Sequence, residues 1–295
     1  SCNMNQSFAK AFYAYASAPD VVAKNISDAI TQINNSTGEI KIQDWRNMNV
    51  IGKPSIDMIC EHIDNSDLFI CDLTTHNHNV LFELGYAIAK NKKIWITLNP
   101  NHHDSAKRYR DLRLITTIGY TTFINSYELA GKFFSDNPHL NDDPTILDRH
   151  EGDISNSLNR RKSSLFHMKS KIQTAESIEL ERELRRGKLT IIQEDPTQAT
   201  GQSLSWYLEN TYHSASVLVH LSPTNGEDLG QDAKYSLAAG IAFGFNRPLL
   251  VLAHSPFQTP IDYRDITIEH TTSQECVGAY KRWIDKIVSS LEEQT

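Results

Sequence analysis

A single acid, Glu83, stands in an otherwise apolar stretch of the chain, and its side chain is of a type that could do chemistry. The segment "NVLFELGYAIA" (79–89) predicts a helix that is apolar on nearly all sides. Such a helix is mostly covered by protein, so its one acid must face a cavity, a partner or solvent. A competing interpretation is structural, because the helix dipole favours a carboxylate near a helix start.

Other polar residues are predicted to lie at the carboxyl edge of a parallel sheet, where open α/β folds bind ligands. Some lie at the end of the apolar strand "DLFICDLT" (67–74), one is expected to cap the next helix, and others lie at or after the ends of the first two predicted strands. The residues that we expect to contact a substrate are Tyr15, Ser17, Asp20, Trp45, Asp72, Thr74 and Asn79.

Each of these residues also has a structural interpretation. Ser17 or Asp20 could cap a helix, Trp45 could fill a small core instead of stacking on a base, and Asp72 could be a turn residue at a strand end. The histidines of the loop "THNHN" (75–79) could act as acid–base groups, but a solvated loop is the favoured interpretation.

Strand and helix patterns alternate in the first half of the chain. Apolar runs predict strands at 11–17, 40–45, 67–74, 94–99 and 116–124, with helices at 20–33, 53–65 and 79–91 between them and a closing helix from 126. This alternation predicts a doubly wound parallel sheet in residues 1–140.

The second half resembles the first. Residues 201–223 align with 52–74, and 238–256 align with 83–100. We therefore expect a degenerate α/β repeat over 188–295, with 188–196 as its opening strand and no room for a second strand, and a linker containing a helix over 141–187. In this alignment Gly85 matches Gly240, as close packing of helix on sheet would require, whereas Glu83 matches Ala238. An acid absent from the second copy is not needed for the fold.

"NVLFELGYAIA", preceded by "SDLFICDLT", resembles the signature of bacterial TIR-like domains, which is roughly Asn-Val-x-x-Glu-Leu-Gly after the third strand. It is also similar to nucleoside 2-deoxyribosyltransferases, which share the flavodoxin-like fold. The segment "AFYAYAS" (11–17) of this chain matches the first strand of those enzymes. Those transferases carry an acidic residue where this chain has "HNHN" (76–79), so the TIR-like family is favoured.

Both resemblances imply cleavage of an N-glycosidic bond, in NAD or in a related nucleotide, with Glu83 as the catalytic carboxylate. The transition state is oxocarbenium-like, so a carboxylate beside the anomeric carbon stabilises or attacks it. The resemblance further implies an anti-phage defence effector that acts as a homo-oligomer or with an activating protein or signal ligand. The alternatives are a non-catalytic nucleotide-sensing or scaffolding module and a true deoxyribosyltransferase.

Composition narrows the remaining possibilities. A net charge of −7 disfavours nucleic acid as a partner, and no apolar run is long enough to predict a membrane span. The four cysteines have no metal-type spacing and the histidines are scattered, so we expect neither a metal nor a cofactor. Isolated thiols without a secretion signal predict a cytoplasmic protein. As a degenerate copy, the second half is expected to regulate or to oligomerise.

Overall fold

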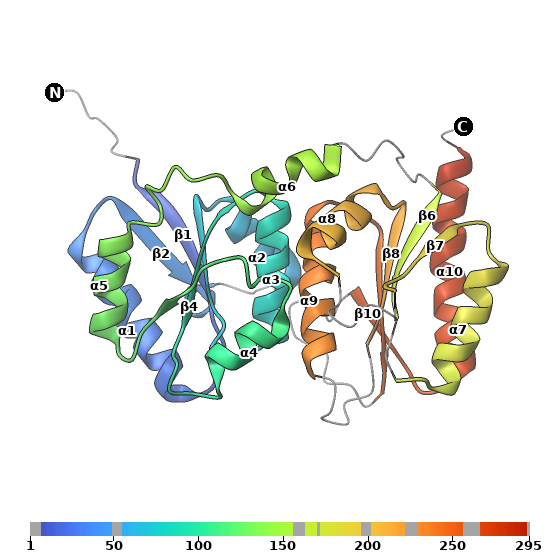
Figure 1. The fold of residues 1–295 in the computed structure, drawn as a ribbon, viewed down its shortest axis with the longest axis horizontal. Coiled ribbons are helices and arrows are strands. Elements are labelled where there is room, and N and C mark those ends of the chain that lie inside the picture. Colours follow the sequence, from blue (N-terminus) through green and yellow to red (C-terminus); the bar gives the residue numbers. More distant parts are fainter. Residues whose placement is uncertain are drawn as a thin grey trace.

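Two five-stranded sheets, each with only parallel neighbours and with helices on both faces, organise the chain (Figure 1). The computed structural model describes residues 7–48, 55–155, 163–169, 172–195, 202–221, 229–255 and 266–293. This architecture confirms the predicted doubly wound α/β class, with a flavodoxin-like strand order in each half.

The first sheet has the order β2-β1-β3-β4-β5. Its strands are β1 (Ala9–Ala14), β2 (Ile40–Asp44), β3 (Leu68–Asp72), β4 (Lys93–Leu98) and β5 (Thr121–Thr122). Its helices are α1 (Asp20–Ser36), α2 (Ser55–Asp64), α3 (His78–Ala89), α4 (Ser105–Leu112) and α5 (Ser126–Asp136). The first four predicted strands are present, whereas the one predicted at 116–124 is reduced to Thr121–Thr122. Strand β3 is buried along its whole length, as a central parallel strand should be.

The second sheet repeats this order as β7-β6-β8-β9-β10. Its strands are β6 (Ser164–Met168), β7 (Thr190–Ile192), β8 (Ser216–Leu221), β9 (Leu249–His254) and β10 (Thr267–His270). Its helices are α7 (Ala175–Arg186), α8 (Leu204–His213), α9 (Leu229–Gly244) and α10 (Ser273–Glu292), and α6 (Ile146–Ser155) packs against α3 and α8 where the two halves meet.

The expected boundary of the second half is wrong. Residues 141–187 are not only a linker, because β6 and α7 lie within them and β6 pairs with both β7 and β8. The run at 188–196 forms the second strand of the repeat, β7, and not its opening strand. The polar sequence around the short strand β6 concealed it, and the second copy has all five strands.

Equivalent hydrogen bonds show which residues of the two halves correspond. The N–H of Asp67 donates to the carbonyl of Lys10 just before β3, and the N–H of Ala215 donates to that of Ser164 just before β8. Counting onward from these pairs, Asp72 corresponds to His220. The sequence alignment is therefore one residue out of register in this strand.

The helices α3 and α9 end in the same way. Asn91 and Asn246 follow them with φ of 59° and 56°, a left-handed conformation that asparagine tolerates. Counting back from these residues, Glu83 corresponds to Ala238 and Gly85 to Gly240, as the sequence alignment predicts.

The two glycines lie where α3 and α9 cross between the halves, not between helix and sheet as expected. A Cβ atom on Gly85 would overlap the backbone oxygen of Leu237, and one on Gly240 would overlap that of Phe82. Phe82 and Leu237 are equivalent residues, as are Gly85 and Gly240, so the two contacts are related by a pseudo-twofold axis between α3 and α9, at the centre of Figure 1. One hydrophobic core cluster continues from the first half into the second through this contact.

No helix within the described residues is long and apolar enough to cross a membrane.

Candidate functional site

A cavity of about 730 Å³ opens at the carboxyl edge of the first sheet. The loops after three strands build it: residues 16–19 after β1, residues 75–78 after β3, and residues from the loop after β4 and from α4, namely His103, Arg108, Asp111 and Leu112. Strands β1 and β3 are neighbours whose connections leave in opposite directions, which makes this the topological switch point where such folds bind ligands.

Two partly buried histidines, His76 and His78, line this cavity, so the expectation of a solvated loop is wrong for them. Burial, together with the nearby positive charge of Arg108, lowers the pKa of His76 to about 4. Burial also lowers the pKa of His78 to about 4. Both rings are therefore neutral at pH 7, and each can donate one hydrogen bond and accept another.

The amino end of α3 points its first turn at the same cavity. The side chain of Asn77 caps the helix by accepting a hydrogen bond from the N–H of Val80 at 3.2 Å, so Asn77 and not Asn79 is the N-cap. No acid stands in the first turn of α3, and Arg108 lines the cavity as a cation. A helix amino terminus beside an arginine favours an anion such as a phosphate.

Asp72 is the last residue of β3, just before the loop that lines the cavity, and it lies in a network of hydrogen bonds. Its carboxylate accepts from the N–H of Thr74 at 3.0 Å and from the hydroxyl of Thr97 at 2.8 Å. Tyr13 shares a 2.7 Å hydrogen bond with Thr97, and the hydroxyl of Thr74 accepts from the N–H of Asn99. Burial raises the pKa of Asp72 to about 6 despite these hydrogen bonds. Asp72 and Thr74 therefore stabilise the strand ends, which agrees with the structural interpretation of Asp72.

A second polar group lies at the ends of β1 and β2. The hydroxyl of Tyr15 donates to the buried carboxylate of Asp44 at 2.5 Å, and the guanidinium of Arg46 donates to the same oxygen. The ring of Trp45 lies 5.9 Å from that of Tyr15 and is 41% exposed. An exposed tryptophan held by an aromatic neighbour offers a stacking surface, so the interpretation of Trp45 as a core residue is wrong.

Glu83 is buried in the second turn of α3, at 6% exposure. The helix begins at His78, so Glu83 lies beyond the first turn and is not a first-turn acid. Its charge adds to burial in raising the pKa of the thiols of Cys60 and Cys71, so it lies toward α2 and β3. It is not among the described residues that line the cavity.

Of the other predicted residues, Ser17 lines the cavity and Asp20 does not. Neither side chain caps α1, since Pro19 occupies the N-cap position without a side-chain hydrogen bond. Arg108 and His103 were not predicted, because α4 and the loop before it are short and polar. The spacing of the buried Tyr109 and Leu112 along one face of "SAKRYRDL" (105–112) is the signal that could have located it.

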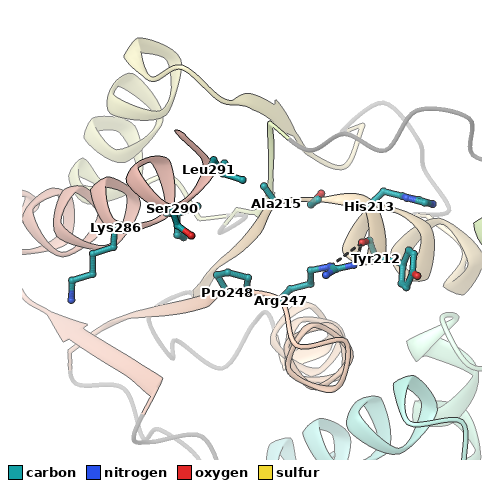
Figure 2. Close-up of a pocket in the computed structure, with 10 residues that line it drawn as sticks. Tyr212, His213, Ala215, Arg247, Pro248, Lys286, Ser290 and Leu291 are labelled. Atoms are coloured by element: carbon teal, nitrogen blue, oxygen red, sulfur yellow. Dashed lines mark hydrogen bonds between the residues drawn. The ribbon is translucent and has the colours of Figure 1, made fainter. Parts of the chain in front are cut away.

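Figure 2 shows a different cavity, of about 510 Å³, at the amino edge of the second sheet. It is lined by the residues that precede β8 and β9 and by the last turns of α10. The guanidinium of Arg247 donates to the carbonyl oxygen of Tyr212 at 2.8 and 2.5 Å and lies over the tyrosine ring. These contacts tie the end of α9 to the end of α8, and parallel sheets do not usually bind ligands at this edge.

No protein family matches the sequence, and no curated protein is similar to it. Among solved structures, a conserved protein of Enterococcus faecalis V583 has 15% identity and a TM-score of 0.32, over 44% of this chain and 99% of its own. The ABC domain of Streptococcus pneumonia in complex with L-Trp has 12% identity and a TM-score of 0.24, over 95% and 85%. A LacI family transcriptional regulator of Arthrobacter has 11% identity and a TM-score of 0.21, over 96% and 91%.

Proposed function

We propose that the first half of the chain binds a nucleotide, NAD or a relative of it, in the cavity at the carboxyl edge of its sheet and cleaves the N-glycosidic bond. The observation that carries the binding proposal is the convergence of the α3 amino terminus and Arg108 on one cavity at the switch point. A phosphate is favoured there by the helix dipole and the guanidinium, and Trp45 offers an aromatic face for a base.

The chemistry rests on the resemblance of "NVLFELGYAIA" (79–89) to glycosidic-bond-cleaving domains and on the buried acid within it. In the reaction, the bond between the anomeric carbon and the base nitrogen breaks and its electron pair leaves with the base. The carboxylate of Glu83 stabilises or attacks the positive anomeric carbon, and water then supplies the hydroxyl group. The neutral side chains of His76 and His78 line the same cavity, and in this proposal they hydrogen-bond to the substrate.

The experiment incubates the full chain, over a range of protein concentrations, with NAD and with nucleosides, and separates the products by chromatography. Release of nicotinamide or of free base by the wild-type chain, lost in Glu83→Gln, supports the proposal. Equal release by Glu83→Gln would show that another group does the chemistry. Added free base distinguishes a transferase, which would exchange bases, from a hydrolase.

A second candidate, a nucleotide-binding module without chemistry, is favoured by the position of Glu83 outside the described lining of the cavity. A rise in melting temperature with intact nucleotide, and no release at any protein concentration, would select this candidate. If the chain shows no rise in melting temperature and also no product release, both candidates are contradicted.

A further inference from the structure

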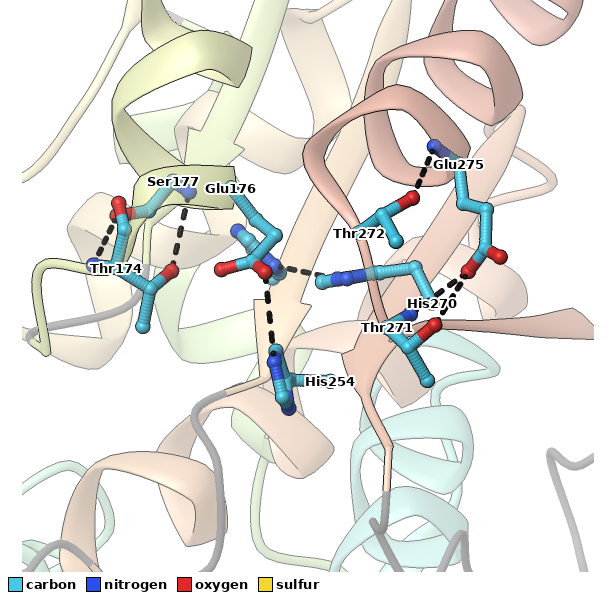
Figure 3. Close-up of polar contacts among 9 residues, drawn as sticks. Thr174, Glu176, Ser177, His254, His270, Thr271, Thr272 and Glu275 are labelled. Atoms are coloured by element: carbon cyan, nitrogen blue, oxygen red, sulfur yellow. Dashed lines mark hydrogen bonds and ion pairs between the residues drawn. The ribbon is translucent and has the colours of Figure 1, made fainter.

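Four histidines gather at the carboxyl edge of the second sheet, one at or near the end of each of four strands. They are His167 in β6, His220 in β8, His254 in β9 and His270 in β10. Glu176, in the first turn of α7, lies beside them with its carboxylate 3.5 Å from Nε2 of His254 (Figure 3). This set lies in the half of the chain to which the proposed nucleotide site does not belong.

Three residues of this region bring their ligand atoms together. Nε2 of His220 lies 3.0 Å from Nε2 of His270, and the ligand atoms of these two rings and of Cys276 lie within 4.8 Å of one another. All three residues are at most 2% exposed. A tetrahedral zinc ion places nitrogen and sulfur ligands about 3.3 to 3.6 Å apart, so small side-chain adjustments would suffice.

The repeat shows that the fold does not require these residue types. The N–H of Ile124 donates to the side chain of Glu128 in one half, and the N–H of Thr271 donates to that of Glu275 in the other. Counting from these matched hydrogen bonds, Phe123 corresponds to His270 and Leu129 to Cys276. Two fully buried apolar side chains of the first half are thus replaced by an imidazole and a thiol, at a cost in desolvation.

Each of the four imidazoles has one nitrogen to which no described neighbour is hydrogen-bonded. One nitrogen of each ring is buried without a hydrogen-bond partner among the described residues: Nε2 of His167 and Nδ1 of His220, His254 and His270. A buried polar atom without a partner destabilises the folded state, and native proteins rarely keep several together without a use. The unpartnered Nδ1 atoms of His220 and His270 are not the Nε2 atoms that lie 3.0 Å apart, so an ion held by the Nε2 pair leaves Nδ1 to bind water.

We propose that the second half binds one zinc-class transition metal ion through His220, His270 and Cys276, with water or Glu176 as the fourth ligand. Imidazole and thiolate ligands select zinc or cobalt over calcium or magnesium, which prefer oxygen. The thiol loses its proton to solvent when the ion binds, and the carboxylate of Glu176 adds negative charge beside the site.

The test uses the full chain, freed of metal with a chelator and then titrated with Zn²⁺ and, separately, with Co²⁺. We expect one equivalent of metal by elemental analysis, a thiolate-to-cobalt charge-transfer band, and a rise in melting temperature with Zn²⁺. Cys276→Ser should abolish the band, and His220→Gln should weaken binding at least about tenfold.

Cys60→Ser is the matched control, because Cys60 is also a buried thiol but lies in the first half. It should keep the stoichiometry and the band. Failure of the wild-type chain to bind an equivalent of either metal, or retention of the band in Cys276→Ser, would overturn the proposal. Should a variant not fold, the stoichiometry and the band of the wild-type chain decide alone.

Discussion

The carboxyl edges of the two sheets occupy equivalent places in one repeated fold, yet they carry different chemistry. Where β1 and β3 hold Tyr13 and Asp72, the matching strands β6 and β8 hold His167 and His220. The first edge is a network of hydroxyl and carboxylate groups behind an open cavity, and the second is a cluster of buried imidazoles. The two halves share the same strand order but differ in the residues at their strand ends, so the fold alone does not determine the chemistry of either edge.

The central helices α3 and α9 also combine matching and diverged positions. Gly85 and Gly240 match because they touch each other's helix across the pseudo-twofold axis. Glu83 and Ala238 do not match, although both are buried. The two positions where backbone lies directly against backbone across the halves both carry glycine, whereas the buried position of Glu83 and Ala238 has diverged.

The largest effect is expected from breaking the contact between the halves. Gly85→Ala and Gly240→Ala each place a methyl group against backbone atoms, which cannot move aside as a side chain tip can. Each should lower the free energy of unfolding by about 3 kcal/mol or more, measured by urea denaturation. Gly131→Ala in α5 is the control, because a Cβ there meets nothing within 4 Å and should be neutral or stabilising. Little loss in either central variant would show that the halves do not pack as described.

The pH dependence of stability should sharpen the description of the first edge. Burial raises the pKa of Asp72 in the folded chain to about 6, above its unfolded value of about 3.9, so the folded state binds the extra proton between these values. The contribution of Asp72 to stability therefore falls as pH rises from about 4 to 6. As pH rises from 4.5 to 7.5, the free energy of unfolding of Asp72→Asn should increase by about 2 kcal/mol relative to that of wild type, measured by urea denaturation. Asp28→Asn, at an exposed site on α1, should follow the wild-type slope, and an identical slope in Asp72→Asn would contradict the assignment.

Nucleotide affinity should depend on the arginine that lines the cavity. Arg108→Ala removes the cation that would pair with a phosphate, and dissociation constants measured by calorimetry should rise about tenfold to a hundredfold. Arg110→Ala carries the same charge change two residues along α4, at an exposed position outside the cavity lining, and should bind like wild type. Equal losses in the two variants would indicate a general charge effect.

The smallest effect is expected at Trp45. If a base stacks on its exposed ring, Trp45→Ala should weaken binding by about 1 kcal/mol, while Trp45→Phe should keep most of the affinity. Trp45 is not among the described residues that line the cavity, and unchanged binding in Trp45→Ala would show that the base does not reach its ring.

Much of the fold could be predicted from the sequence because apolar periodicity marks buried strands and helices directly. "LFICD" (68–72) and the helical face of Val22, Ile26 and Ile33 needed no tertiary information. The strand β6 and the helix α4 were not predicted, because both are short and their polar residues interrupt the apolar pattern. The N-cap was placed two residues late because Asn77 and Asn79 have the same chemistry, and only backbone geometry distinguishes them.

By itself, the sequence determined the α/β class, the repeat and the unusual burial of one acid, since each depends on patterns local to the chain. Tertiary structure alone decided which distant residues meet. It brought Arg108 to the loop after β3, set Gly85 against the backbone of Leu237, and assembled His220, His270 and Cys276 from two strands and a helix. The physical reason is that a strand's polar end carries no periodic signal, and its partners are fixed only when the neighbouring strands take their places in the sheet.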